Sequence, residues 1–277
     1  MNNRNAPIGV FDSGVGGLTV LQALRQRLPE ESFIYLGDTA RLPYGTKSKQ
    51  TVVHYATQAA RILLEQGIKM LVVACNTASA LALPELQQEF AGIPVVGVVE
   101  PGAKAACAAT QSGQIIVIAT ESTVNHCAYQ NAIKKLNPEA IVHASSCSLF
   151  VALAEEGWLE GPIAEAVARR YLEPLFAEAK ESDCLVLGCT HFPALLPTFR
   201  KILQDQIIIV DSAQTTATAV AEILDCQQLN CPSDHNPALQ LLATDSPQRF
   251  AKVAAQFLNH PIVPQQVQLV ELKSNHP

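Results

Sequence analysis

Short apolar runs alternate along this chain with longer segments whose apolar positions recur at helical spacing. The apolar runs are rich in Ile, Val and Leu, which is typical of buried strands. We expect strands at residues 8–11, 33–36, 70–74, 95–99, 115–118, 140–143, 184–187 and 207–210. The segments between them predict helices at 17–28, 48–66, 79–90, 121–136, 162–180 and 213–226.

This alternation predicts an α/β protein with mostly parallel sheets, because parallel strands need a crossover connection that a helix supplies. Nearly continuous apolar strands suit sheets covered by helices on both faces. The last part of the chain, QLLATDSPQRFAKVAAQFLN and then VQLVEL, is interpreted as strand, helix and strand, and it is placed in the sheet of the N-terminal strands. Residues 232–237 are expected to form an exposed loop.

Two pairs of strand ends resemble each other. LVVACNT (71–77) matches LVLGCTH (185–191), and IGVFDS (8–13) matches IIVIAT (115–120). The similarity indicates two similar α/β domains related by a pseudo-two-fold axis, with the active site at their interface. A segment with Gly and Pro at 97–102 predicts a domain boundary, and the chain is expected to return to the first domain near 210. The predicted first domain is therefore 1–98 plus 211–277, and the second is 99–210.

The polar residues that follow the strands carry the candidate chemistry, because ligands bind outside the carboxyl ends of parallel strands. Cys75 and Cys189 stand at equivalent strand ends and would approach one cleft from opposite sides. Thiols on opposite faces of one carbon suit inversion: a thiolate removes the Cα proton and the other thiol returns one. Cys has a pKa of about 8.5, so both forms are accessible near neutral pH.

Carbanion formation also needs donors that hold the substrate carboxylate. Helix N-termini after the strands supply backbone N–H groups. Side-chain donors are expected from Ser13, Asn76, Thr77, Thr120 and Thr190. Asp12 is expected to tune the Cys75 side of the site, and His191 the Cys189 side.

Simpler interpretations stand beside these. A single Cys is more often a buried core thiol, and the other six cysteines are expected to be structural. FDSGVGG could bind phosphate, but it lacks a Lys at Walker spacing and the dinucleotide spacing. Asp12 could cap the helix that follows it, and His191 could also be a helix cap. Metal binding by Cys189 and His191 is disfavoured, since no second ligand pair accompanies them.

Composition excludes several classes. Of 277 residues, 48% are apolar and 16% charged, and the net charge is −6, which disfavours disorder. Without a Lys/Arg cluster, nucleic acid and anionic membranes are unexpected partners. No apolar run approaches the ~18 residues of a membrane span, and the N-terminus has no apolar signal core, which predicts a cytoplasmic protein. The eight cysteines form no Cys-x-x-Cys pair, so disulfide and zinc frameworks are disfavoured.

The chain resembles the glutamate racemase family, of the aspartate/glutamate racemase superfamily. The resemblance is carried in order by IGVFDSGVGGLTVL (8–21), YLGDTARLPYGTKS (35–48), VVACNTASA (72–80), GVVEPGAKAA (97–106), ATESTV (119–124), EEG (155–157), LGCTHFPALLP (187–197) and VDSA (210–213). These stretches span most of the chain. Ala119 stands where many members have Gly, with little expected consequence.

The resemblance implies cofactor-independent interconversion of L- and D-glutamate for peptidoglycan synthesis, with no metal. It implies Cys75 and Cys189 as the acid/base pair, assisted by Asp12, Glu156 and His191. The family's substrate-binding positions correspond here to Asp12, Ser13, Tyr44, Gly45, Asn76, Thr77, Thr120, Thr123, Thr190 and His191. The expected partner is a small-molecule substrate, and many members form homodimers.

Three rival functions are compatible with the same residues. A sister racemase acting on aspartate or a hydantoin would keep both cysteines. A non-catalytic protein on this scaffold would bind glutamate without exchanging its Cα hydrogen. A thiol redox protein would join Cys75 and Cys189 reversibly, although the missing Cys-x-x-Cys motif disfavours it.

Overall fold

The chain folds around two separate parallel sheets in the computed structural model, which describes residues 4–203, 205–232, 236–258 and 260–272. One sheet has the strand order β10-β9-β2-β1-β3-β4 and the other β6-β5-β7-β8, and every strand pairing among the described residues is parallel. The strands are β1 (Ile8–Asp12), β2 (Phe33–Gly37), β3 (Met70–Val73), β4 (Val95–Gly97), β5 (Gln114–Ala119), β6 (Ile141–Ser146), β7 (Cys184–Gly188), β8 (Ile208–Asp211), β9 (Leu239–Ala243) and β10 (Val267–Leu269).

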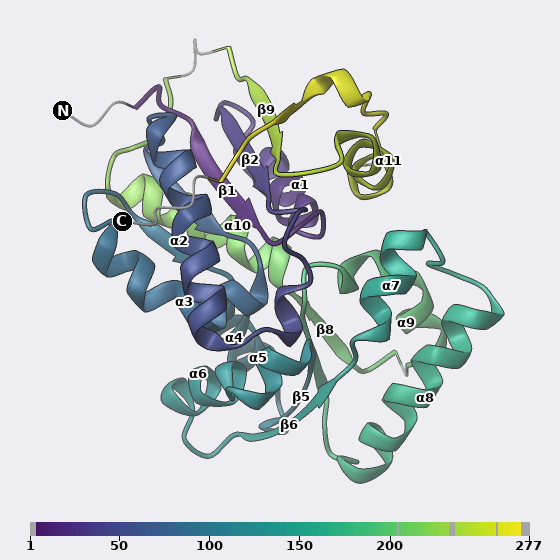
Figure 1. The fold of residues 1–277 in the computed structure, drawn as a ribbon. Helices are drawn as coiled ribbons and strands as arrows, with labels where there is room; N and C mark the ends of the chain where they lie inside the picture. The colour runs from purple at the N-terminus through teal and green to yellow at the C-terminus, as the bar shows by residue number, and fades with distance from the viewer. Residues whose placement is uncertain (1–3, 204, 233–235, 259, 273–277) are drawn as a thin grey trace.

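Helices surround both sheets (Figure 1). They are α1 (Leu18–Arg27), α2 (Lys49–Glu65), α3 (Asn76–Glu89), α4 (Val99–Ala109), α5 (Glu121–Asn125), α6 (Ala128–Leu136), α7 (Leu149–Glu156), α8 (Pro162–Glu178), α9 (Leu196–Ile202), α10 (Ser212–Cys226) and α11 (Pro247–Leu258). Short 3-10 turns occur at Tyr44–Thr46, Phe192–Leu195 and Pro264–Gln266. The predicted α/β class with parallel sheets is confirmed.

Each sheet buries both faces, as the apolar strands predict. In β1, Ile8 and Val10 pack with α1, α10 and α11, whereas Phe11 packs with α2 and α3. In β5, Ile116 and Ile118 face α7, α8 and α9, whereas Ile115 and Val117 face α4 and α6. Alternate side chains therefore enter different cores, because successive residues of a strand point to opposite faces.

All eight expected strands are present, and the C-terminal segment adds β9 and β10 to the first sheet. The first sheet thus combines strands from residues 8–97 with strands from 239–269, and the second uses residues 114–211. The domain boundaries at 98/99 and 210/211 stay a prediction. Part of the loop expected at 232–237 lies outside the described residues.

The helices differ from the prediction in two ways. Three helices of the structure, α4, α7 and α9, were not predicted, and one predicted helix is divided into two. α4 contains Pro101 of the GVVEPG segment, but in its first turn, where the missing N–H breaks no helical hydrogen bond. The helix expected over 121–136 is divided into α5 and α6 at Cys127, whose φ of 52° lies in the left-handed region.

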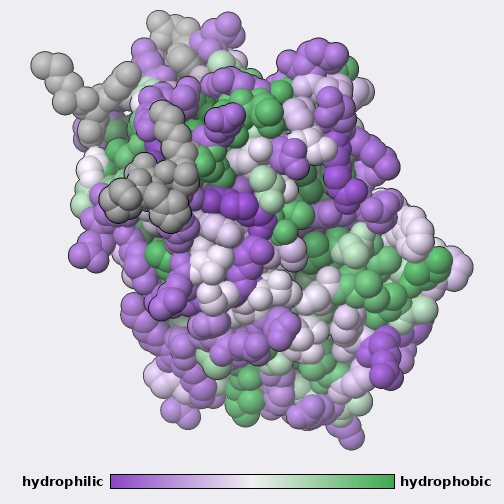
Figure 2. Space-filling model, in the orientation of Figure 1, coloured by the Kyte–Doolittle hydropathy of each residue, from purple (hydrophilic) through white to green (hydrophobic). Residues whose placement is uncertain are grey.

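The surface has a mixed polar and apolar character, and no helix among the described residues is long and apolar enough to cross a membrane. An apolar area covers α7 and the start of α8 (Figure 2). Leu149, Trp158 and Ile163 are large apolar side chains of this region with about half of their surface exposed.

A buried ion pair joins distant segments at the amino-terminal end of the first sheet. Lys69 Nζ contacts Glu31 Oε2 at 2.5 Å, and their side chains are only 2% and 3% exposed. The same ammonium group donates to the carbonyl oxygens of Arg4 and Leu229, at 2.7 and 2.8 Å. The pair therefore ties the N-terminal segment to the chain that follows α10.

We predict that Lys69→Met lowers the free energy of unfolding by about 3–5 kcal/mol, because it leaves the Glu31 carboxylate buried without a cation. Urea denaturation followed by circular dichroism measures the change. Arg61→Met is the matched control: its pair with Glu89 is exposed, so its loss should stay below about 1 kcal/mol. Equal losses in the two variants would contradict the assignment.

Candidate active site

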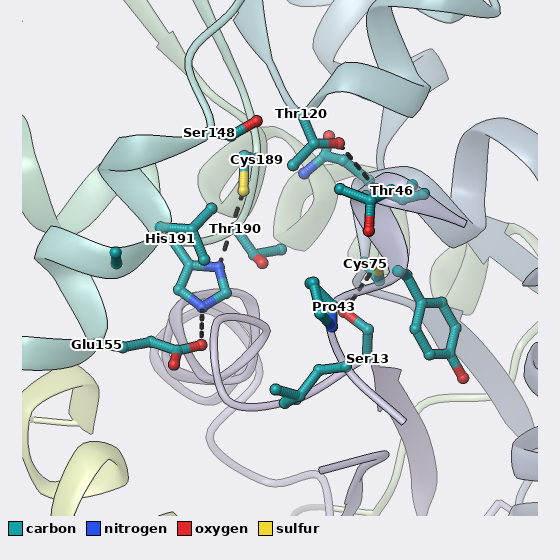
Figure 3. Close-up of a pocket in the computed structure, with 18 residues that line it drawn as sticks. Ser13, Pro43, Thr46, Cys75, Thr120, Ser148, Glu155, Cys189, Thr190 and His191 are labelled. Carbon is teal, nitrogen blue, oxygen red and sulfur yellow. Dashed lines mark hydrogen bonds and ion pairs between the residues drawn. The ribbon is translucent and has the colours of Figure 1, made fainter. Parts of the chain in front are cut away.

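A cavity of about 320 Å³ lies where loops from the carboxyl ends of both sheets meet. Figure 3 shows Cys75 and Cys189 reaching it from the two different halves of the molecule. Of the residues predicted from the sequence, the cavity is lined by Ser13, Tyr44, Gly45, Cys75, Asn76, Thr77, Thr120, Cys189, Thr190 and His191. Asp12, Thr123 and Glu156 do not line it.

Cys75 occupies the position between β3 and α3 and serves as the N-cap of that helix. Its sulfur accepts the Ala78 backbone N–H at 3.4 Å and lies 3.3 Å from Ser13 Oγ. Burial and the nearby Asp12 carboxylate raise the pKa of Cys75 to about 12, although the contacts with Ser13 and Ala78 oppose the shift. Near neutral pH Cys75 is therefore a protonated thiol that can donate a proton.

Cys189 has a different neighbour, the imidazole of His191. The Cys189 sulfur lies 3.8 Å from His191 Nδ1, and His191 Nε2 lies 3.1 Å from Glu155 Oε1 (Figure 3). Burial lowers the pKa of His191, but hydrogen bonds to Cys189 and Glu155 outweigh burial and raise it to about 10. An imidazolium beside a sulfur favours a thiolate in general, so His191 gives Cys189 a neighbour of opposite character to the Asp12 carboxylate near Cys75.

Asp12 lies beneath the cavity and connects the two halves. Its fully buried carboxylate accepts the Gly14 backbone N–H at 2.8 Å and the Thr190 hydroxyl at 3.5 Å. Burial raises the pKa of Asp12, whereas the nearby His191 lowers it. Asp12 does not cap α1, since the N-cap of that helix is Gly17, and the His191 side chain makes no cap hydrogen bond.

The remaining polar groups suit a ligand that carries carboxylates. Asn76 Oδ1 accepts from the Tyr129 hydroxyl at 2.7 Å, but its buried Nδ2 has no partner among the described residues. A buried donor without a partner costs free energy, so this amide is suited to donate to a ligand bound in the cavity. Thr120 Oγ1 lies 2.9 Å from Thr77 Oγ1 and 3.1 Å from Thr123 Oγ1, which places Thr123 behind Thr120.

Tyr44 and Gly45 form one wall of the cavity. The Tyr44 hydroxyl donates to Asp38, so it is already occupied, and burial raises the pKa of Tyr44 well above its usual value. A Cβ on Gly45 would lie 2.9 Å from Thr120 Cβ, so the missing side chain allows this wall to approach the other half.

The acidic partner of His191 is Glu155, and not Glu156, which the family resemblance implied as an assisting residue. Glu155 is 16% exposed and lines the cavity, whereas the Glu156 side chain is 56% exposed and contacts Arg249 at 3.7 Å. Consecutive helical residues point about 100° apart, so only one member of this Glu-Glu pair at the end of α7 can face the site. The sequence alone does not indicate which of the two glutamates faces the site, because that depends on the rotation of α7 about its axis.

Other lining residues were also missed. Ser148 adds a hydroxyl before α7, and Leu42, Pro43, Val151 and Ala152 add apolar surface. Ser148 was not predicted as a site residue, because the helix that follows it, α7, was not predicted. Within the described part of the chain, no group of three or more His, Cys, Asp or Glu side chains could hold a metal ion. All eight cysteines are free thiols, including both in the cavity.

Comparison with known proteins identifies the class of this molecule. A family profile described as Asp/Glu/Hydantoin racemase matches residues 16–220. The chain therefore belongs to the Asp/Glu/Hydantoin racemase family, and the predicted enzyme class, an amino-acid racemase, is confirmed.

Within that family, the similar proteins are named glutamate racemase, as the sequence motifs indicated. One from Geobacter metallireducens is 50% identical over 251 residues, 91% of this chain and 92% of the relative. The glutamate racemase of Francisella tularensis in complex with D-glutamate is 38% identical, with a TM-score of 0.90, over 98% of this chain and 99% of that chain. The Thermus thermophilus glutamate racemase with β-chloro-D-alanine is 42% identical, with a TM-score of 0.87, over 97% and 98%.

We predict that Gly16→Ala lowers kcat/KM by about 10²-fold, since displacements near 1 Å have such effects. A Cβ there would lie 2.4 Å from both His191 Nδ1 and Thr190 Oγ1, so the imidazole must move. Steady-state racemisation measures the loss. Gly92→Ala, which meets no atom within 4 Å, should retain wild-type activity. Wild-type kcat/KM for Gly16→Ala would show that the loop does not position His191.

A second prediction separates the two glutamates. Glu155→Gln should lower kcat/KM about 10- to 100-fold, because a hydrogen bond to a charged group contributes about 1.5–3 kcal/mol. Glu156→Gln should change it less than about threefold, since that carboxylate is exposed. Polarimetric racemisation assays of both variants provide the measurement, and the reverse order of effects would restore the role to Glu156.

Proposed function

We propose that this chain interconverts L- and D-glutamate through two acid/base thiols, Cys75 and Cys189. The observation that carries the proposal is that two free thiols with unlike polar environments line one cavity. One thiol removes the Cα proton from one face and the other protonates the opposite face, which inverts the centre.

We infer the first roles of the two thiols from their surroundings. Cys75 is a buried thiol beside the Asp12 carboxylate, so it begins as the acid. Cys189 faces His191, whose imidazolium stabilises a thiolate, so it begins as the base. After one turnover the roles are exchanged, and the reverse reaction starts from Cys75. On the family's usual pattern, Cys75 removes the proton of D-glutamate and Cys189 that of L-glutamate.

The deprotonated Cα needs groups that stabilise charge on the neighbouring carboxylate. The buried Asn76 Nδ2 has no protein partner in the described structure and is the first such donor. The hydroxyls of Ser13, Thr120 and Thr190 line the same cavity, and Thr77 and Thr123 orient Thr120. Tyr44 and Gly45 form the wall against which the substrate lies.

Asp12, Glu155 and His191 complete the proposed machinery. Asp12 couples the Cys75 side to Thr190, and Glu155 keeps His191 protonated opposite Cys189. Glutamate, rather than the alternative aspartate, is favoured because relatives up to 50% identical are named glutamate racemase. We extend the proposal to a cytoplasmic enzyme in two domains, 1–98 with 211–277 and 99–210, that works without a cofactor, acts as a homodimer and supplies D-glutamate for peptidoglycan.

The deciding experiment follows the Cα hydrogen in D₂O. With either enantiomer, the wild-type protein should place deuterium in the product enantiomer from the first turnovers, while remaining substrate keeps hydrogen. Cys75→Ser and Cys189→Ser should each lower racemisation by about 10²- to 10⁴-fold, because a hydroxyl is a much weaker acid than a thiol. NMR and chiral chromatography measure exchange and inversion separately.

Matched variants make this outcome specific. Cys189→Ser should still exchange the Cα hydrogen of D-glutamate without inverting it, and Cys75→Ser should do so with L-glutamate. Cys107→Ser, a free thiol outside the cavity, should behave as the wild type. Exchange of aspartate but not glutamate would establish the alternative substrate, and near-wild-type turnover by either serine variant would refute the two-thiol mechanism.

A further inference from the structure

Helix α11 contacts the His191–Glu155 pair from outside the cavity. The Phe257 ring packs edge-on against His191, with ring centroids 5.8 Å apart and an interplanar angle of 86°. Arg249 Nη2 lies 3.4 Å from Glu155 Oε2 and 3.7 Å from Glu156 Oε1. Neither α11 side chain lines the cavity. One helix thus touches both members of the pair that faces Cys189.

The Glu155 carboxylate is held at both of its oxygens. Oε1 faces His191 Nε2 at 3.1 Å, and Oε2 accepts from Arg249 at 3.4 Å. A carboxylate with one partner can rotate about its terminal torsion, whereas two partners on different elements fix its plane. The orientation of Glu155 in turn fixes which edge of the imidazole faces the Cys189 sulfur.

We propose that Arg249 is a positioning residue for the racemase reaction: it holds Glu155 so that His191 stays aligned with Cys189. The effect of Arg249 on racemisation kinetics rests on the proposed function, whereas its effect on the ionisation of Cys189 does not. α11 packs in the core of the first sheet, with α1 and α10, whereas α7 and His191 belong to the half built on the second sheet. Arg249 therefore links the relative placement of the two halves to the state of one thiol.

The charges around these groups give the direction of the effect. Glu155 faces His191 and Arg249, and it also feels Asp12; His191 faces Cys189, Glu155 and Asp12. Arg249 contacts Glu155, and Glu155 contacts His191 Nε2, the ring nitrogen opposite the one that faces Cys189. The lost Arg249 charge by itself favours the imidazolium, but Arg249 is 60% exposed and its charge is screened by solvent. A Glu155 that is no longer held at Oε2 aligns less well with the imidazole and stabilises the imidazolium less, which shifts the Cys189–His191 pair towards thiol and neutral imidazole. Cys75, whose charged neighbours are Asp12 and Cys189, has no contact with Arg249.

The test measures the ionisation of each thiol separately. Iodoacetamide alkylation is followed across neutral and alkaline pH in the full-length protein, with peptide mass spectrometry to quantify Cys75 and Cys189. In Arg249→Gln the pH midpoint for alkylation of Cys189 should rise, and the alkylation rate of Cys75 at each pH should not change. Arg249→Lys, which keeps a cation that can contact Glu155, should recover part of the shift. Arg169→Gln removes an exposed pair with Glu173 on α8 and is the matched control.

Kinetics supply the second readout. Because Arg249 is 60% exposed, we expect Arg249→Gln to lower kcat/KM by only about three- to fivefold, the range of an exposed ion pair. The loss should be equal for both enantiomers, since their equilibrium constant is one. An unshifted Cys189 midpoint, or equal changes in the alkylation rates of both thiols, which would indicate general loosening of the structure, would overturn the proposal. Alkylation needs no turnover, so a failure of glutamate racemisation would be seen separately.

Discussion

Two thiols line one cavity in opposite electrostatic surroundings, and the rest of the site is arranged around that difference. A buried thiol next to a carboxylate stays protonated, whereas a thiol next to an imidazolium can ionise. Asp12 and His191 supply these opposite surroundings for Cys75 and Cys189. The proposed inversion needs one acid and one base at a time, and unlike surroundings favour one placement of the proton over the other.

The fold satisfies this requirement with two similar sheets that carry different additions. Both thiols follow a parallel strand, β3 or β7, so the two halves present them in comparable ways. The difference comes from what is added around them: Ser13 and the start of α3 at Cys75, and His191 with Glu155 at Cys189. The missing side chains of Gly16 and Gly45 allow the two halves to approach closely around the cavity, at His191 and at Thr120.

The surroundings of Cys189 are assembled from more of the chain than those of Cys75. Glu155 comes from α7, His191 from the turn after β7, and Arg249 and Phe257 from α11 near the end of the chain. These elements are far apart in sequence, and α11 belongs to the core of the other sheet. The Cys189 side of the site therefore includes contacts from both halves, whereas the Cys75 sulfur contacts Ser13 and Ala78 within its own half.

The sequence by itself determined the alternation of strands and helices, the two matched strand ends and the pair of cysteines, because these depend on local periodicity and on short motifs. It also predicted most lining residues, since strand-end polar groups meet at one edge of a parallel sheet. Only the tertiary structure decided that Glu155 rather than Glu156 faces His191, that Thr123 lies behind Thr120, and that α11 reaches the site. Those outcomes depend on the rotation of α7 about its axis and on packing between distant elements, which no local pattern encodes.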